Sequence, residues 1–395
     1  MWYIQLSLNT TYMNPSVSNI IEEDGILRFT LSDVNVSYAN ALRRIIVADI
    51  PTVVFRTFPH AANRASIETN TTRFNNEIIK QRLSCVPIHH VAVDQPIEDL
   101  VVEIDVTNST DAITYITTED FKVKNIKADK YLPDTEAKKM FPPNALTGTY
   151  IDFARLRPKL TQSGSGEALK LNCRLDIGTA REDGAYNVAC MCTYGLTKDE
   201  NKAKEAWAEK RQSLQKEGAS KEDIELQEKN WPLLMAKRYT RPDSFDFAIE
   251  TVGVYNNMEL VKLGCAVMQK QLDQFAEMIQ QQAADIIGTS ATTMPNAYDV
   301  KLAGIDYTVG KVIEYYLYAT YFASEPLKLG FSALPTGGRT IQYCGFKKPH
   351  PHIDESLLRV SFISDGNDKD TLVFMLLKAV EKSKEVFTKM AEQFS

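Results

Sequence analysis

Alternating apolar and polar residues predict short strands along the chain. In the first strand, Leu27, Phe29 and Leu31 alternate with polar residues, which is typical of a strand with one buried face. The segment from about Arg56 to Leu196 contains short strands and turns, which predicts a mostly β region. Strands are expected at Val101–Val106, Tyr186–Tyr194, Phe245–Val252, Asp299–Asp306 and Leu358–Phe362.

Two short helices are predicted from apolar residues at helical spacing. The first covers Val36–Asp49 and ends before Pro51, because the residue preceding a proline avoids the helical region. The second lies near Val309–Thr320. Their apolar faces include Leu42, Ile45, Val312 and Tyr316.

Two longer helices are predicted from apolar residues that step by three and four positions, which is the pattern of a helix packed lengthwise on another helix. The first seam consists of Met258, Val261, Cys265, Met268, Leu272, Phe275 and Ile279. The second seam consists of Leu372, Leu376, Ala379, Ser383, Val386 and Met390.

The order strand, short helix, strand and long helix occurs twice, once over Ile26–Gln282 with a large insertion and once over Asp299–Phe394. Such repetition indicates two related units. Each unit alone would leave its long-helix seam exposed, so we expect the two seams to pack together as in an isologous dimer. The predicted fold class is α+β: two dimerisation units, each a small antiparallel sheet with long helices, form a pseudo-dimer within one chain.

The predicted domain boundaries follow from this repeat. A mostly β insertion interrupts the first unit, and a short linker joins the two units. The ranges are 1–56 and 238–286 for dimerisation unit 1, 57–237 for the insertion, 287–297 for the linker and 298–395 for dimerisation unit 2.

Within the insertion, a charge-dense segment at about 197–230 is rich in helix-forming residues. Its basic and acidic residues nearly balance. This composition predicts a solvated helical hairpin or arm, and an arm that docks a neighbouring subunit is the alternative.

Composition narrows the function classes. The net charge of −6 argues against a protein that wraps nucleic acid alone, since that requires a large basic surface. Six cysteines are too few for a disulfide scaffold, which favours an intracellular protein. Met1–Thr10 lacks a basic segment leading into an apolar one, so no secretory signal is predicted. No run of apolar residues is long enough to span a membrane.

Several motifs resemble one protein family. Asn40-Ala41-Leu42-Arg43-Arg44, within the predicted first helix, is similar to the dimerisation helix of the RNA polymerase alpha family. That family includes bacterial alpha, archaeal D and the third-largest subunit of eukaryotic RNA polymerase II. The segments Phe74–Ile88, Gly178–Ala189 and Phe245–Gly253 resemble later parts of the same family, in the same order.

The second half is similar to the family's small partner, which is archaeal L or the eleventh subunit of the eukaryotic enzyme. Asp306-Tyr307-Thr308-Val309-Gly310 resembles the segment before that partner's first helix, with Tyr307 in place of histidine. Tyr343–Ile353 resembles its proline- and histidine-containing segment. Because the partners are separate chains in cells, a fused form resembles the arrangement in some large DNA viruses.

The resemblance implies a non-catalytic subunit that nucleates assembly of the two large catalytic subunits of a DNA-directed RNA polymerase. It implies a large-subunit interface at Asn40, Arg43, Arg44, Arg82, Leu83 and Pro87. By its residues alone, the segment that contains Arg82 is equally compatible with a plain strand followed by a turn that contacts no partner. The interface between the two halves is expected at the two seams together with Leu42, Ile45, Val312 and Tyr316.

No cofactor is expected in this chain. The clustered cysteines that hold zinc or an iron–sulfur centre in some relatives are missing after Pro87, where Cys85 stands alone. A site made from Cys85, His89, Cys190 and Cys192 is the alternative. His350 and His352 are interpreted as part of a rigid turn. Magnesium is expected in the large subunit, and zinc in other subunits.

The expected partners are the two largest polymerase subunits and small zinc-binding subunits, with one copy of this chain per complex. No sequence-specific DNA contact and no membrane contact is expected. An intracellular location follows; for a viral protein it would be the virion or a cytoplasmic virus factory, with the nucleus left open. The alternative function is a stand-alone nucleic-acid-binding or metal-binding protein with a duplicated fold.

Overall fold

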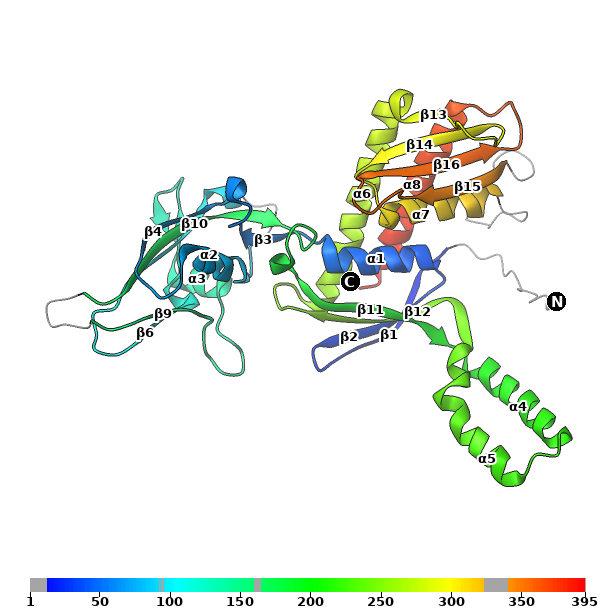
Figure 1. The fold of residues 1–395 in the computed structure, drawn as a ribbon, viewed down its shortest axis with the longest axis horizontal. Coiled ribbons are helices and arrows are strands. Elements are labelled where there is room, and N and C mark those ends of the chain that lie inside the picture. Colours follow the sequence, from blue (N-terminus) through cyan, green and yellow to red (C-terminus); the bar gives the residue numbers. More distant parts are fainter. Residues whose placement is uncertain (1–12, 92, 94–95, 160–164, 323–339, 395) are drawn as a thin grey trace. The chain divides into compact units, whose positions relative to one another are not determined.

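A computed structural model of the protein describes residues 13–91, 93, 96–159, 165–322 and 340–394 (Figure 1). Met1–Thr10, where no signal was predicted, lies outside these residues. The chain divides into two compact units. The first unit falls within Met1–Ile46, Met191–Glu250 and Asn257–Ser395, and the second within Val47–Cys190 and Thr251–Asn256. The predicted domain boundaries cut the chain at other residues and stay a prediction.

The first unit contains a four-stranded sheet in the order β1-β2-β12-β11. Phe29 and Phe247 lie opposite each other on β2 and β12, and their rings stack with centroids 5.0 Å apart. The alternation that predicted these strands therefore reflects one apolar face. The strands are β1 (Ser16–Glu23), β2 (Ile26–Ser32), β11 (Ala189–Lys198) and β12 (Thr240–Thr251).

The first unit also contains a second four-stranded sheet, in the order β13-β14-β16-β15. Arg359 on β16 donates two hydrogen bonds to Asp299 on β14, at 2.6 and 2.8 Å. The predicted linker begins with a strand, because Ile287 pairs with Val300. The strands are β13 (Ile287–Thr289), β14 (Ala297–Ala303), β15 (Ile341–Lys347) and β16 (Glu355–Phe362).

The four helices expected from apolar spacing are confirmed, and all contribute to the first unit. A π-helical turn, Tyr318–Phe322, follows the second short helix. The helices are α1 (Val36–Ala48), α6 (Asn257–Ile286), α7 (Tyr307–Leu317) and α8 (Lys369–Glu392).

The charge-dense segment forms a helical arm between β11 and β12, in which α4 and α5 make a hairpin (Figure 1). Asp199 caps α4 and Ser220 caps α5, each accepting a hydrogen bond from a backbone N–H three residues on. The elements of the arm are α4 (Glu200–Lys216), α5 (Lys221–Asn230) and two 3-10 helices, Trp231–Leu233 and Met235–Arg238.

The second unit is mostly β, as predicted for this stretch. Its larger sheet follows the order β3-β10-β5-β7-β8, with β4 also paired to β10, and β6 pairs with β9. The strands are β3 (Thr52–Phe55), β4 (Ala65–Asn70), β5 (Leu100–Thr107), β6 (Thr114–Thr117), β7 (Lys122–Asn125), β8 (Lys130–Tyr131), β9 (Asp152–Leu156) and β10 (Ala168–Gly178). The helices are α2 (Asn76–Ser84) and α3 (Asp134–Met140), with 3-10 turns at His60–Ala62, Ile97–Asp99, Thr118–Asp120 and Gly184–Tyr186.

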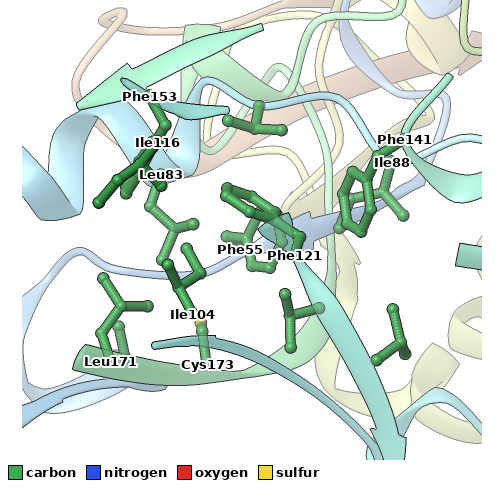
Figure 2. Packing of buried hydrophobic residues seen from close by; sticks show 14 of the residues in the cluster. Phe55, Leu83, Ile88, Ile104, Ile116, Phe121, Phe141, Phe153, Leu171 and Cys173 are labelled. Atoms are coloured by element: carbon green, nitrogen blue, oxygen red, sulfur yellow. The ribbon is translucent and has the colours of Figure 1, made fainter. Parts of the chain in front are cut away.

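An aromatic cluster forms the core of the second unit (Figure 2). The ring of Phe121 meets those of Phe141 and Phe153 edge to face, at centroid distances of 5.2 and 5.4 Å. Such edge contacts are favourable because the ring quadrupoles are complementary. Leu83 from α2 lies in the same cluster.

Two local predictions are wrong. The strand predicted at Tyr186–Tyr194 begins only at Ala189, because Asp183 accepts a hydrogen bond from the Ala185 N–H and starts a 3-10 turn that includes Tyr186. The strand considered around Arg82 is a helix, because Asn75 caps it by accepting a hydrogen bond from the Ile78 N–H.

Among the described residues, no helix is long and apolar enough to cross a membrane.

Candidate functional site

The inner face of α1 packs against α7 and α8 in the first unit. The Tyr38 hydroxyl lies 3.0 Å from the Ser383 hydroxyl. The Tyr38 ring lies 5.5 Å from that of Phe387 and 6.2 Å from that of Tyr315. Burial raises the pKa of Tyr38, so its hydroxyl is neutral and free to share this hydrogen bond. The predicted first helix is thereby joined to the last one.

Arg44 connects α1 to the start of α7. Its Nε donates to Thr308 Oγ1 at 2.9 Å, and its Nη2 donates to Asp306 Oδ2 at 2.8 Å. Both the arginine and the aspartate side chain are partly shielded from water, with 34% and 21% of their surface exposed. The planar guanidinium suits such a two-point contact.

Asp306 has a second task, because it is also the N-cap of α7. Its Oδ1 accepts a hydrogen bond from the Thr308 N–H at 2.8 Å. The next residue, Tyr307, accepts a hydrogen bond at its hydroxyl from the Lys348 N–H at 3.3 Å. Three segments that carry the sequence resemblance, around Arg44, Asp306 and Lys348, therefore meet at one end of α7.

The outer face of α1 carries the remaining polar residues of the motif. Arg43 donates from Nε and Nη2 to the Asn40 side-chain oxygen, each at 3.0 Å. This contact holds both side chains in one orientation. Val36, one turn earlier, is 47% exposed. The face thus presents a fixed polar pair beside an apolar residue, a surface suited to a protein partner.

The predicted seam residues are buried between α6 and α8, apart from Met258, which is half-buried. Leu260, which the prediction omitted, is buried in its place. The buried set comprises Val261, Cys265, Met268, Leu272, Phe275 and Ile279 on α6 and Leu372, Leu376, Ala379, Val386 and Met390 on α8. Leu42, Ile45, Val312 and Tyr316 of the two short helices are also buried.

Polar contacts along the seam give the direction of the two helices. Gln269 donates to Thr388 at 2.7 Å, and Lys384 donates to Asp273 at 2.5 Å. Near the other end, Lys369 donates to the Ala284 carbonyl at 3.1 Å. Because residue numbers rise on α6 as they fall on α8, the two helices run antiparallel.

Gly264 is a packing position of α6, facing α1, that the sequence argument missed. A Cβ atom at this position would lie 2.9 Å from Cγ1 of Ile46 and 3.2 Å from Cδ1 of Leu42. The absence of a side chain therefore lets α1 cross close to α6. A glycine inside an otherwise strong helical pattern was the available signal, since it costs helix stability unless packing requires it.

The other predicted interface residues lie in the second unit. Arg82 donates to the backbone carbonyls of Phe153 and Asp152 at 2.7 and 2.6 Å, which ties α2 to β9. Leu83 is 1% exposed, and Pro87 is half-buried. A partner contact here stays a prediction, in which Arg82 and Leu83 would act by positioning α2.

The alternative metal site was considered at Cys85, His89, Cys190 and Cys192. In the part of the chain that the structure describes, no three His, Cys, Asp or Glu residues are grouped to hold a metal ion. Cys85 and Cys190 are exposed, whereas Cys192 is buried. The rings of His350 and His352 lie edge to face at 5.1 Å, and the His352 N–H donates to Nδ1 of His350 at 3.1 Å.

Comparison with known proteins assigns these features to a family. A family model described as the RNA polymerase Rpb3/Rpb11 dimerisation domain matches residues 28–272. The DNA-directed RNA polymerase subunit Rpo3 of Pyrococcus horikoshii is 26% identical over an alignment of 288 residues that covers 66% of this chain and 96% of that protein.

Two further relatives differ in coverage. The Conjugation stage-specific protein of Tetrahymena thermophila is 20% identical over 295 residues, covering 65% of this chain and 92% of that protein. Subunit 3B of the DNA-directed RNA polymerases IV and V of Arabidopsis thaliana is 38% identical over 66 residues, only 17% of this chain and 18% of that protein. The similarity is thus extended in the Pyrococcus and Tetrahymena proteins and local in the Arabidopsis subunit.

Proposed function

This chain belongs to the RNA polymerase Rpb3/Rpb11 dimerisation domain family, and on that premise we propose that it is a non-catalytic assembly subunit of a DNA-directed RNA polymerase. In this proposal the chain contains both partners of the dimerisation pair. It forms a pseudo-heterodimer by itself and nucleates assembly of the two large catalytic subunits.

The observation that carries the proposal is the antiparallel packing of α6 on α8. Along the chain, α6 follows the strands of the first four-stranded sheet and the short helix α1. In the same way, α8 follows the strands of the second four-stranded sheet and the short helix α7. An isologous pair requires two similar halves that bury related faces against each other, and here both halves lie within the first compact unit. The Arg44–Asp306 contact supports the same reading, because it joins a short helix of one half to that of the other.

Within this proposal, the outer face of α1 is the contact for a large subunit. Asn40 and Arg43 are preferred to Arg44, because Arg44 already donates to Asp306 and Thr308. A prearranged pair loses little side-chain freedom when a partner binds, which favours affinity. Arg82, Leu83 and Pro87 form the second expected contact, with small zinc-binding subunits nearby.

The proposal extends to the origin and setting of the chain. Residues after 272, outside the matched family segment, form all four strands of the second sheet and the helices α7 and α8, which supports a fusion of two partners. Joining them raises the effective concentration of one half for the other, to about the millimolar range for a short linker. A large DNA virus is the proposed source, with the protein inside the virion or infected cell, magnesium in the large subunit and zinc in other subunits.

Co-purification of the tagged chain from its native setting tests the proposal. We expect two very large chains in stoichiometric amounts and RNA synthesis by the eluate. An Arg43→Glu variant should lose at least one large chain, because it reverses the charge on the outer face of α1. Arg28→Glu is the matched control, since Arg28 is an exposed arginine on β2.

Recovery of the wild-type chain alone, or with only a small unrelated protein, would overturn the assembly role. Equal recovery of both large chains with Arg43→Glu and Arg28→Glu would leave the assembly role standing and remove the outer face of α1 from it.

A further inference from the structure

The helical arm contains a cavity that the proposed assembly role does not use. It lies between the start of α4 and the 3-10 segment after α5, with a volume of about 320 Å³. Its walls include Ala203 and Trp207 from α4 and Trp231, Pro232 and Ala236 from the other side. Ligand sites span about 300–1,000 Å³, so this cavity fits one large side chain with its flanking backbone.

The two tryptophans make the cavity apolar, with one polar group left over. Their rings lie 5.4 Å apart at an angle of 43°. Trp231 donates its indole N–H to the Ala203 carbonyl at 3.2 Å. The Trp207 Nε1 is buried and has no acceptor among the described residues. A buried donor without a partner is unfavourable, and a ligand that brings a carbonyl or carboxylate oxygen would satisfy it.

Three lysines and two carboxylates line the cavity, which leaves a small excess of positive charge. Lys198, Lys204 and Lys237 line it, and no ion pair joins any of them to a carboxylate in the described part of the chain. Asp199 and Glu200 also line it. Asp199 is already engaged, because it caps α4 and lies 3.6 Å from the Lys202 ammonium. The unpaired lysines favour a ligand with negative charge.

An apolar rim continues from the cavity. Leu233 and Leu234 lie between the lining residues Pro232 and Ala236, and they are 60% and 72% exposed. These side chains contribute little to the fold, yet they interrupt an otherwise charged arm. Exposed apolar residues beside a cavity are typical of a protein-binding surface.

We propose that the arm docks an acidic segment of a partner protein, which inserts one aromatic or leucine side chain into the cavity that Trp207 and Trp231 line. The inserted side chain replaces water in the cavity, a backbone or carboxylate oxygen accepts the Trp207 N–H, and the acidic residues face the three lysines. The remaining apolar contact is made by Leu233 and Leu234. The inference is independent of the polymerase assignment.

Fluorescence polarisation with the full chain tests this site. The probe is a labelled, otherwise acidic heptapeptide with one central phenylalanine, and the comparison peptide has alanine at that position. We expect the phenylalanine peptide to bind at least about tenfold more tightly, because one inserted aromatic residue dominates such contacts. Binding should weaken as salt is added, because the lysines are exposed.

Matched variants locate the effect. Ala236→Trp fills the cavity and should lower the affinity for the phenylalanine peptide at least about tenfold. Ala208→Trp, at an exposed position of α4 outside the cavity, should leave that affinity unchanged. Lys204→Glu should lower the affinity for the phenylalanine peptide and reduce the salt dependence of its binding. Lys221→Glu, at an exposed position of α5, should change neither.

Equal binding of the two peptides, or an Ala236→Trp variant that binds as the wild type does, would overturn the proposal. If a phenylalanine peptide whose acidic residues are replaced by lysine binds equally tightly, the partner segment need not be acidic, and that part of the proposal is wrong. Sedimentation of the full chain tests whether a second copy of this chain occupies the cavity. A concentration-dependent dimer that Ala236→Trp abolishes would assign the cavity to that second copy and overturn the proposal.

Discussion

At the residue scale, Arg44 and Asp306 explain why two distant motifs carry the residues they do. One carboxylate caps α7 through Oδ1 and accepts Arg44 through Oδ2. Thr308 supplies both the N–H for the cap and the hydroxyl for Nε of Arg44. A change at any one of the three side chains therefore disturbs the contacts of the other two.

Replacing Arg44 by alanine should lower the free energy of unfolding by about 1–3 kcal/mol, because a charge-assisted pair is lost in a partly shielded place. Arg44→Lys should recover only part of this, since an ammonium lacks the planar fork. Urea unfolding measures the effect, with the exposed Arg28→Ala as control. Equal stability of Arg44→Ala and Arg28→Ala would contradict a structural role for Arg44.

The cysteines differ in their environment, which predicts their reactivity. Burial raises the pKa of Cys173, Cys192 and Cys265 to about 12, so near neutral pH these thiols are protonated and shielded. Cys85 and Cys190 are exposed. Because the thiolate is the reacting species, the three buried cysteines should react with iodoacetamide only after unfolding.

Mass spectrometry after brief treatment at about pH 8 should therefore find label on Cys85 and Cys190 first. The same pattern is expected with and without a chelator, because no metal is expected at these residues. Protection of Cys190 that the chelator removes would instead support a metal site.

At the element scale, close packing of two helices depends on glycines at positions where a side chain would not fit. A Cβ at Gly264 would press on Ile46, and one at Gly310 would lie 2.4 Å from the Phe346 ring. The first lets α1 cross α6, and the second lets α7 lie on β15. In both places packing, and not backbone conformation, requires glycine.

Gly264→Val should lower the free energy of unfolding by about 1–3 kcal/mol, as expected for overpacking of a filled interior. The matched control is Ala266→Val, at an exposed position of the same helix, which should cost only a few tenths of a kcal/mol through helix propensity (about 0.5 kcal/mol at most). Thermal and urea unfolding of both variants measure the difference. A gain in stability for Gly264→Val would show that α1 can move away without loss.

At the scale of the whole molecule, the connection after α6 is expected to be dispensable once the chain has folded. Ala291–Thr293 is exposed and lies between β13 and β14. The contacts between α6 and α8 do not involve it. A protease site introduced there should be cut without separating the two fragments, because their interface is apolar and antiparallel.

Size-exclusion chromatography at high salt after cleavage should show one species containing both fragments, since salt screens exposed ion pairs but not apolar contacts. Leu272→Ala in the seam should make the cut form separate more readily, at a cost of about 2–5 kcal/mol. Ala266→Val is again a control. Two separate fragments from the wild-type chain would contradict the intramolecular pair.

The sequence by itself determined the position and kind of most elements. The alternation at Leu27–Leu31 and the steps of three and four from Val261 to Ile279 are properties of neighbouring residues, and they correspond to β2 and α6. The second short helix was also predicted from its apolar spacing, although α7 begins two residues earlier, at Tyr307, with Asp306 as its N-cap. Such patterns are informative because the buried face of a helix or strand sets the spacing of apolar residues that are close together in sequence.

Only the tertiary structure decided which residues meet. Arg44 finds Asp306 across 262 positions, and Arg82 spends its donors on carbonyls of β9, so neither pairing could be read from local spacing. Gly264 looks like a weak point in α6 until α1 is placed against it. The physical reason is that periodicity states which face of an element is buried, whereas its partner depends on chain segments far away in sequence.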